Sequence, residues 1–252
     1  MNFDSQIVLV TGASRGIGRA IARQFAEHGA RVAVHYNSNQ QAADETLASL
    51  PGSGHSIIQA DLADAEAVER MVRTVIESMG GLQVLVNNAG IYEEHKITGV
   101  DYAFWQASWL KTLQTNLLGA ANAAYCAAQH MKVHGGGRII NVSSRGAFRG
   151  EPDAPAYGAS KAAMNAMGQS LARALGPHGI YVTTVAPGWV ETDMATDYLA
   201  GPDGDGIRAQ SSLGRVATPD EVAYTVLFLA SAGAEFLTGG IIDVNGASYL
   251  RS

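Results

Sequence analysis

Tyr157 and Lys161 are the two side chains whose types and spacing could do acid–base chemistry. They lie four residues apart in a stretch rich in alanine and polar residues, 157–175, which predicts a helix, so both are expected on one helix face. A nearby positive charge favours the phenolate and lowers a tyrosine pKa from its unperturbed value of about 10. We therefore expect Lys161 to bring Tyr157 toward the pH range in which a general acid or base works. An isolated pair at this spacing is equally typical of a surface tyrosine beside a lysine, so the rest of the chain decides.

A glycine-rich turn near the N-terminus indicates a site for a dinucleotide. The segment Thr11-Gly12-Ala13-Ser14-Arg15-Gly16-Ile17-Gly18 lies between an apolar run and a helical pattern. Glycines there permit a tight turn and close approach of the backbone to a diphosphate at the helix N-terminus. The spacing is Gly-x-x-x-Gly-x-Gly rather than the commoner Gly-x-Gly-x-x-Gly, so a purely structural turn is the alternative. Its strand–turn–helix context favours cofactor binding.

The end of the second apolar run bears on the choice of cofactor. An acid about twenty residues after the glycines, which would bind the adenosine ribose hydroxyls, is missing. The chain instead reads His35-Tyr36-Asn37-Ser38-Asn39. These neutral residues would not repel a 2′-phosphate, and Arg15 could pair with one, although a solvated charge is the alternative for Arg15. The segment therefore favours NADP(H) over NAD.

Short apolar runs alternate with helical patterns along the whole chain. The runs lie at 7–10, 32–34, 56–58, 84–86, 138–142, 181–185 and 241–244, and the helices are expected at 17–28, 40–50, 65–79, about 102–133, 157–175 and 220–230. Runs without polar alternation indicate strands buried on both faces. We predict a single α/β domain spanning residues 1–252, a doubly wound Rossmann fold with a seven-stranded parallel sheet and helices on both faces.

Ligands of such a sheet bind beyond the carboxyl ends of its strands. The notable residues fall there: Gly12, Asp61, Asn87, Ser144 and Pro187-Gly188. The predicted site therefore gathers at one edge of the sheet.

Composition limits the partners and the compartment. The formal net charge is −6 and no run of lysines or arginines occurs, which argues against nucleic acid. Cys126 is the single cysteine, so no intrachain disulfide can form and a reducing compartment is favoured. The N-terminus does not resemble a signal peptide, and no segment has the roughly 18 apolar residues that span a membrane. We expect a soluble cytoplasmic protein that binds neither nucleic acid nor membrane.

Three further motifs make a resemblance specific. They are Asn87-Asn88-Ala89-Gly90, Thr115-Asn116-Leu117 and Pro187-Gly188, in order with the glycine turn, Ser144 and the Tyr157–Lys161 pair. With them the chain, from residue 7 to 246, resembles the short-chain dehydrogenase/reductase family, and within it the compact bacterial 3-oxoacyl-[acyl-carrier-protein] reductases. The resemblance implies an NADP(H)-dependent oxidoreductase that interconverts a ketone and a secondary alcohol.

The resemblance also implies a role for each matching residue. Tyr157 would protonate the carbonyl oxygen as hydride arrives, and Lys161 would hold the nicotinamide ribose. Ser144 would donate a hydrogen bond to the substrate oxygen, and Asn116 would position a water that links Lys161 to solvent. The cofactor would contact Gly12, Ser14, Arg15, Gly16, Ile17, Gly18, Tyr36, Asn37, Ser38, Asp61, Leu62, Asn88, Ala89, Gly90, Tyr157, Lys161, Pro187, Gly188, Val190 and Thr192. No metal site is expected.

Three segments are expected around the substrate. Residues 145–151 and the loop of about 189–215 should line the pocket, and the glycine-rich stretch 201–206 is expected to be a flexible part of a lid. Arg145 and Arg149 could recognise a carboxylate or phosphate, although solvated surface arginines are favoured. The segment 92–96 is longer than the family pattern and lies at the mouth of the site; its two glutamates and histidine favour a solvated loop over a metal site.

The finer function stays open at this point. Reduction of 3-oxoacyl groups on an acyl carrier protein is one alternative, although basic patches for an acidic partner are sparse. An NAD-dependent sugar or steroid alcohol dehydrogenase is another, and a non-catalytic NADP-binding redox sensor is a third. The resemblance also implies a homotetramer, paired through the helices ending near Val133 and starting at Tyr157.

Overall fold

The computed structural model describes residues 1–251 and contains one parallel seven-stranded sheet, as predicted. The strands are β1 (Ile7–Val10), β2 (Arg31–Tyr36), β3 (Ser56–Gln59), β4 (Val84–Asn87), β5 (Gly137–Val142), β6 (Ile180–Pro187) and β7 (Ile241–Val244). Their order is β3-β2-β1-β4-β5-β6-β7, so the winding reverses between β1 and β4. Such a switch point opens a crevice beyond the carboxyl ends of the two strands.

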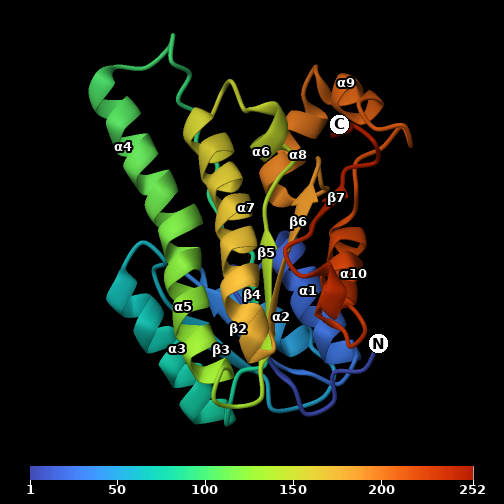
Figure 1. Ribbon diagram of the computed structural model, residues 1–252. Coiled ribbons are helices and arrows are strands. Elements are labelled where there is room, and N and C mark those ends of the chain that lie inside the picture. Colours follow the sequence, from blue (N-terminus) through green and yellow to red (C-terminus); the bar gives the residue numbers. More distant parts are fainter. Residues whose placement is uncertain (252) are drawn as a thin grey trace.

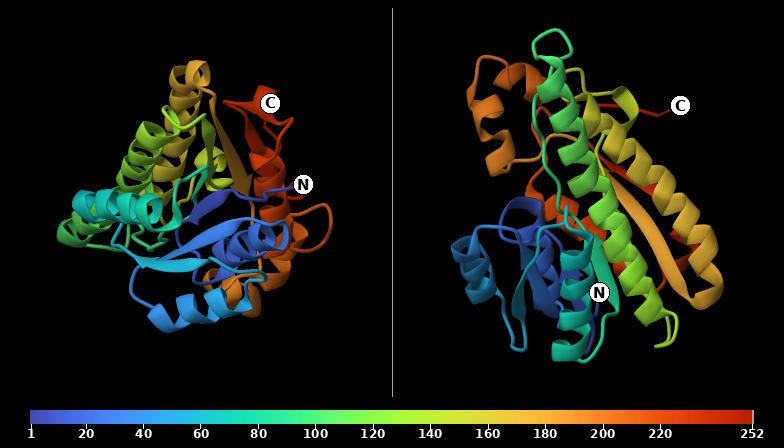
Figure 2. Two further views of the ribbon diagram at one scale, coloured as in Figure 1. Left: turned by 90° about the horizontal axis from the view of Figure 1, so that it is seen from below. Right: turned by 90° about the vertical axis from the view of Figure 1, so that its left-hand side faces the viewer.

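Helices lie on both faces of the sheet (Figures 1 and 2). They are α1 (Gly16–Glu27), α2 (Gln40–Ser49), α3 (Ala65–Met79), α4 (Tyr102–Leu113), α5 (Gly119–Met131), α6 (Gly146–Arg149), α7 (Pro155–Leu175), α8 (Asp193–Ala200), α9 (Gly204–Ala209) and α10 (Pro219–Ala230). Within residues 1–251, none of these helices has both the length and the apolar character that crossing a bilayer requires.

The core is divided into two layers by the sheet. Along β1, Val8 and Val10 pack into the cluster that contains residues of α1 and α10. Ile7 and Leu9 point the other way, into the cluster that contains residues of α3 and α5. Successive side chains of a strand face opposite sides, so a strand covered on both faces must be apolar throughout. This burial explains the uninterrupted apolar runs of the sequence.

The predicted long helix at about 102–133 is interrupted. A π-helical turn, Gln114–Leu118, separates α4 from α5, and the Gly119 N–H donates to the carbonyl oxygen of Gln114, five residues back. Asn116 lies inside this turn and is fully buried. One extra residue in a turn barely disturbs the apolar pattern, so periodicity alone could not reveal it.

The glycine-rich stretch at 201–206, expected to be a flexible part of a lid, includes the start of a short helix. The segment enters α9, which lies with α8 beyond the carboxyl ends of the strands (Figure 1). Gly204 packs directly against the carbonyl oxygen of Leu199, which also accepts a hydrogen bond of 3.0 Å from the Arg208 guanidinium. The glycine there permits close packing of the two short helices.

Candidate active site

The glycine turn is shaped by close backbone contacts. Gly12 has a φ of +63°, and a Cβ there would lie 2.9 Å from the Cα of Ala89. A Cβ on Gly18 would collide with the Gly12 carbonyl oxygen and lie 2.5 Å from the Asn88 amide nitrogen. The Asn88 amide donates to the carbonyl oxygens of Thr11 and Gly12 at 2.8 and 3.1 Å. Close packing and hydrogen bonds therefore hold the glycine turn against the segment after β4, at the switch point of the sheet.

His35 supports this turn and was not singled out from the sequence. It is buried at the end of β2, its Nδ1 accepts the Gly12 N–H at 2.9 Å, and its Nε2 donates to the carbonyl oxygen of Ala60 at 3.0 Å. Burial lowers the pKa of His35, and the Ala60 carbonyl and Asp61 oppose the shift. The hydrogen bonds require a neutral ring with its proton on Nε2. The available signal was a histidine within a largely apolar strand. This strand, β2, is adjacent in the sheet to β1, which leads into the glycine turn.

The free energy of unfolding should therefore decrease in acid, because His35 is buried in its neutral form. A histidine pKa that is lowered on folding contributes stability above its unfolded value of about 6.5, and this is lost as the pH falls through the folded value. We expect His35→Gln to lose less free energy of unfolding than the wild type between about pH 7.5 and pH 5.5 in urea titrations. Exposed His178, replaced by Gln, is the control. Equal acid sensitivity in wild type and His35→Gln would refute the assignment.

A cavity of about 580 Å³, here called the main cavity, lies beyond the carboxyl ends of the strands. Its volume is in the range of small-molecule sites. Its wall includes every residue predicted to contact a cofactor, together with Ser144, Tyr157 and Lys161. Asn116 is not on the wall, whereas His35, Thr115 and Met194, which were assigned no role of their own from the sequence, are.

Tyr157 and Lys161 project from one face of α7, as their spacing predicts. The Lys161 Nζ lies 5.8 Å from the centre of the Tyr157 ring and donates to the carbonyl oxygen of Val142 at 2.7 Å. The Ser144 Oγ accepts the Gly146 N–H at 3.0 Å, so its own proton stays available for a donor role. The three side chains thus meet on the wall of the main cavity.

The expected lowering of the Tyr157 pKa by Lys161 is wrong for this structure. Burial raises the pKa of Tyr157 to about 12; hydrogen bonding with Ser144 opposes this, and the charge of Glu151 adds to it. Burial lowers the pKa of Lys161 to about 8. Desolvation disfavours both charged forms and outweighs their attraction here. The phenol consequently keeps its proton at neutral pH, which suits a general acid.

Asn116 is held by the protein around it. Its Oδ1 accepts the Ile91 N–H at 2.8 Å, and its Nδ2 donates to the Ile91 carbonyl oxygen at 3.0 Å and to Ser160 at 3.2 Å. A Cβ on Gly90 would lie 3.3 Å from the Lys161 Nζ and 3.4 Å from the Asn116 Oδ1. Asn116 therefore lies next to Lys161, and its side-chain amide fixes the segment that follows β4.

Comparison with known proteins identifies the family of the chain. The sequence profile of a family described as Enoyl-(Acyl carrier protein) reductase matches residues 12–247. Over 244 residues the chain is 39% identical to the 3-oxoacyl-[acyl-carrier-protein] reductase FabG of Staphylococcus aureus, covering 96% of this chain and 97% of the relative. The chain belongs to the short-chain dehydrogenase/reductase family.

Other members of the family are equally similar over their full lengths. A 3alpha-hydroxysteroid dehydrogenase of Mediterraneibacter gnavus is 37% identical over 255 residues, covering 98% of each chain. The crystal structure of a short chain dehydrogenase from Burkholderia cenocepacia in complex with NADP is 36% identical, with a TM-score of 0.88 and coverage of 98% and 99%. The Staphylococcus aureus and Mediterraneibacter gnavus relatives are named for different substrates, so the family does not by itself name one.

In this family member the segment 92–96 reaches the main cavity. The rings of Tyr92 and Tyr157 meet edge to face with centroids 5.2 Å apart. The Tyr198 hydroxyl, on α8, donates to the Glu94 carboxylate at 2.7 Å and so links the predicted lid to this segment. Aromatic rings and a side-chain contact between distant segments therefore border the space in front of Tyr157.

The expectation of a solvated loop is wrong for His95, which is fully buried. Its Nε2 accepts the Ala156 N–H at 3.1 Å, and its Nδ1 donates to the Glu93 carbonyl oxygen at 2.7 Å. No group of three or more potential metal ligands occurs among residues 1–251. His95 thus anchors the segment to the start of α7, close to Tyr157.

The two pocket arginines behave differently. Arg149 is exposed and lies 3.7 Å from the Glu151 carboxylate, in line with the expectation of a surface arginine. Arg145 is only 4% exposed, so the same expectation is wrong for it. Its position directly after β5 and Ser144, at the start of α6, places it inside the protein. Arg15 is exposed and lies 3.9 Å from Asp193.

Proposed function

We propose that this family member is an NADP(H)-dependent oxidoreductase that interconverts a ketone and a secondary alcohol. The observation that carries the proposal is the meeting of Ser144, Tyr157 and Lys161 on the cavity wall that the glycine turn also borders. The Staphylococcus aureus relative, named as a 3-oxoacyl reductase, supports the reaction class. The NADP-bound Burkholderia cenocepacia relative supports the cofactor.

The glycine turn fits a dinucleotide. Side chains on Gly12 and Gly18 would clash with Ala89 and with the Gly12 carbonyl oxygen, so this turn requires glycine at both positions. The helix α1 begins at Gly16, which lines the main cavity, so its N-terminus is suited to a diphosphate. When bound, the nicotinamide cofactor supplies the hydride chemistry, and the protein supplies orientation and protons. The main cavity is therefore suited in shape and chemistry to hold the cofactor beside Tyr157.

The residues of the chain then divide the work. The Tyr157 phenol, protonated at neutral pH because its pKa is about 12, gives its proton to the carbonyl oxygen in the direction of reduction. The Ser144 hydroxyl donates a hydrogen bond to the same oxygen and stabilises its developing charge. Lys161, charged below about pH 8, would bind the ribose hydroxyls. Through a water positioned by Asn116 it would link Tyr157 to solvent, from which the phenol regains its proton.

The preference for NADP(H) rests on the residues that follow β2. Tyr36, Asn37 and Ser38 line the main cavity and carry no negative charge. Arg15 lines it too, and its exposed side chain, 3.9 Å from Asp193, could turn toward a 2′-phosphate. We expect Asn37→Asp to weaken NADPH binding by about tenfold or more through like-charge repulsion, with less effect on NADH. Fluorescence titration of both cofactors measures this. Gln41→Glu, which adds the same charge on α2, is the control, and equal loss of both cofactors would contradict the preference.

A screen of ketones tests the reaction. Loss of NADPH absorbance with members of a ketone panel is the expected result. A pure protein that binds NADPH but is inert on every ketone would instead support the redox sensor. Acyl-carrier-protein reduction and NAD-dependent sugar or steroid alcohol oxidation remain finer alternatives. Arg138, one of the sparse basic residues available to an acidic carrier, is already paired with Glu235 at 2.6 Å.

The proposal includes a homotetramer in the cytoplasm. Large apolar side chains are exposed along α4 and α5 and in the turn between them: Tyr102, Phe104, Leu110, Leu118 and Tyr125. These exposed apolar side chains support subunit contacts, because exposed apolar surface marks interaction sites. Size-exclusion chromatography with light scattering tests the assembly. The single cysteine, Cys126, is free and supports a reducing compartment.

A further inference from the structure

Arg145 carries a buried charge that forms no ion pair among residues 1–251; Glu151 acts on it only from beyond ion-pair distance, and Arg149 repels it. The residue is 4% exposed, and among residues 1–251 its guanidinium makes no side-chain hydrogen bond and has no carboxylate within 4.0 Å. The neighbouring Glu151 is closer to Arg149, at 3.7 Å. Burying a charge without a partner is costly, so such groups are normally paired. An arginine kept in this state is suited to an anionic ligand.

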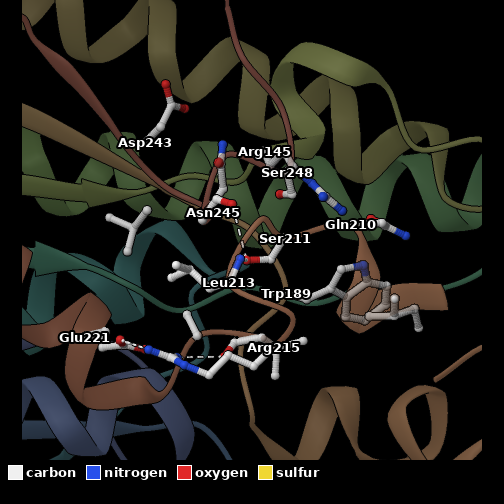
Figure 3. Close-up of a pocket in the computed structure, with 15 residues that line it drawn as sticks. Arg145, Trp189, Gln210, Ser211, Leu213, Arg215, Glu221, Asp243, Asn245 and Ser248 are labelled. Carbon is white, nitrogen blue, oxygen red and sulfur yellow. Dashed lines mark hydrogen bonds and ion pairs between the residues drawn. The ribbon is translucent and has the colours of Figure 1, made fainter. Parts of the chain in front are cut away.

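The guanidinium borders a second cavity, of about 200 Å³, here called the side cavity (Figure 3). Figure 3 shows Arg145 and Ser248 on the same side of it. The Ser248 Oγ is buried and has no hydrogen-bond partner among the described residues. A second unsatisfied polar group therefore lies on the wall beside the arginine.

The other charged groups of this wall are already neutralised. Arg215 is bound to Glu221 at 2.6 Å, and Asp243 is bound to Arg251 at 2.8 Å. Arg145 is thus the one charge on the described wall without an ion pair. A ligand group with a single negative charge would balance it, whereas a dianion would leave an excess of negative charge next to two carboxylates.

The side cavity adjoins the reacting centre. Arg145 directly follows Ser144, and its N–H donates to the Pro187 carbonyl oxygen at 2.7 Å. A Cβ on Gly188 would lie 3.4 Å from the Ser248 Oγ. Arg145 also lines the main cavity, so one ligand can contact both spaces. A substrate with its carbonyl at Ser144 can therefore place another group against Arg145.

We propose that Arg145 and Ser248 form a subsite for a carboxylate of the substrate, which makes the substrate an oxo acid and the product the corresponding hydroxy acid. The planar guanidinium fork matches a carboxylate in bidentate fashion, and the serine hydroxyl supplies one more donor. The proposal rests on the proposed function, because it extends the same site. It specifies a substrate class that the reaction class leaves open.

The first test compares oxo acids with their methyl esters as substrates of the NADPH-dependent reaction. We use a series of 2-oxo, 3-oxo and 4-oxo acids, and expect at least one acid to exceed its ester in kcat/KM by about 100-fold, as for a buried charge pair. Arg145→Gln should remove most of that preference, and Arg173→Gln, an exposed arginine of α7, should retain it. Esters that match their acids throughout, or a preference unchanged in Arg145→Gln, would overturn the proposal. Failure of the proposed function would give a different result, because NADPH would then be oxidised with none of the acids or esters.

The second test does not depend on turnover. In the Tyr157→Phe protein, calorimetric titration with the same acids should detect binding that Arg145→Gln weakens by about 30-fold or more and Ser248→Ala by several-fold. Binding that is indifferent to both changes would refute the subsite. Stronger competition by inorganic phosphate than by any acid would refute the carboxylate assignment.

Thermal unfolding tests whether Arg145 has a merely structural role. Arg145→Met removes an unpaired buried charge, so we expect a melting temperature at least as high as that of the wild type. Saturating oxo acid should raise the melting temperature of the wild type but not of this variant. A lower melting temperature in Arg145→Met, with no response of the wild type to acids, would assign Arg145 to packing and overturn the proposal.

Discussion

Replacement of Tyr157 by phenylalanine is expected to lower kcat by about 10²–10⁴-fold while leaving the Kd for NADPH nearly unchanged, as for removal of a general acid. The phenol holds its proton because burial raises its pKa to about 12, and it shares the cavity wall with Ser144. Phenylalanine keeps the ring and its edge-to-face contact with Tyr92 but removes the proton. Single-turnover oxidation of NADPH measures the chemical step, and fluorescence titration measures cofactor binding.

The matched control is Tyr125→Phe, because Tyr125 is an exposed tyrosine of α5. Its kcat should equal that of the wild type. Substantial turnover in Tyr157→Phe would mean that another group donates the proton. Glu151 would be the first candidate, because it lines the main cavity and burial raises its pKa.

Features encoded by local spacing were predictable from the sequence. The apolar runs predicted the strands, and the glycine turn predicted a strand–turn–helix at the switch point. A separation of four residues predicted that Tyr157 and Lys161 share a helix face. In each case the physical cause lies within a few residues of the chain, so the sequence alone was sufficient.

Features that depend on contacts between distant segments were not predictable. His95 is buried because Ala156, 61 residues away, donates to it, and His35 is buried because β2 lies between β1 and β3. Arg145 resembles a surface arginine in the sequence because nothing local indicates its burial. The same reason explains why the pKa shift of Tyr157 was predicted in the wrong direction. The attraction between Tyr157 and Lys161 depends on two residues that are close in the sequence, whereas desolvation depends on all the segments that surround the phenol.

Replacement of Lys161 by methionine is expected to change activity and stability in opposite directions. Lys161→Met is expected to lower kcat/KM by about 100-fold or more, because the ammonium beside Tyr157 and its hold on the cofactor are lost. The cofactor-free variant should nevertheless be more stable than the wild type near pH 7. Burial lowers the Lys161 pKa to about 8, so the folded state binds its proton less readily than the unfolded chain. Urea denaturation with and without NADPH measures both effects.

The pH dependence makes the Lys161 prediction specific. A pKa lowered on folding contributes full stability above the unfolded value of about 10.4, and this is lost as the pH falls through about 8, after which the cost is constant. The stability gained by Lys161→Met should therefore be largest below about pH 8 and shrink toward pH 10.5. Exposed Lys132, replaced by Met, should show no such trend. A Lys161→Met protein less stable than wild type near pH 7 would mean that the 2.7 Å bond to Val142 outweighs desolvation of the ammonium. The lysine would then stabilise the cofactor-free protein, whereas the burial of its ammonium indicates a cost in stability.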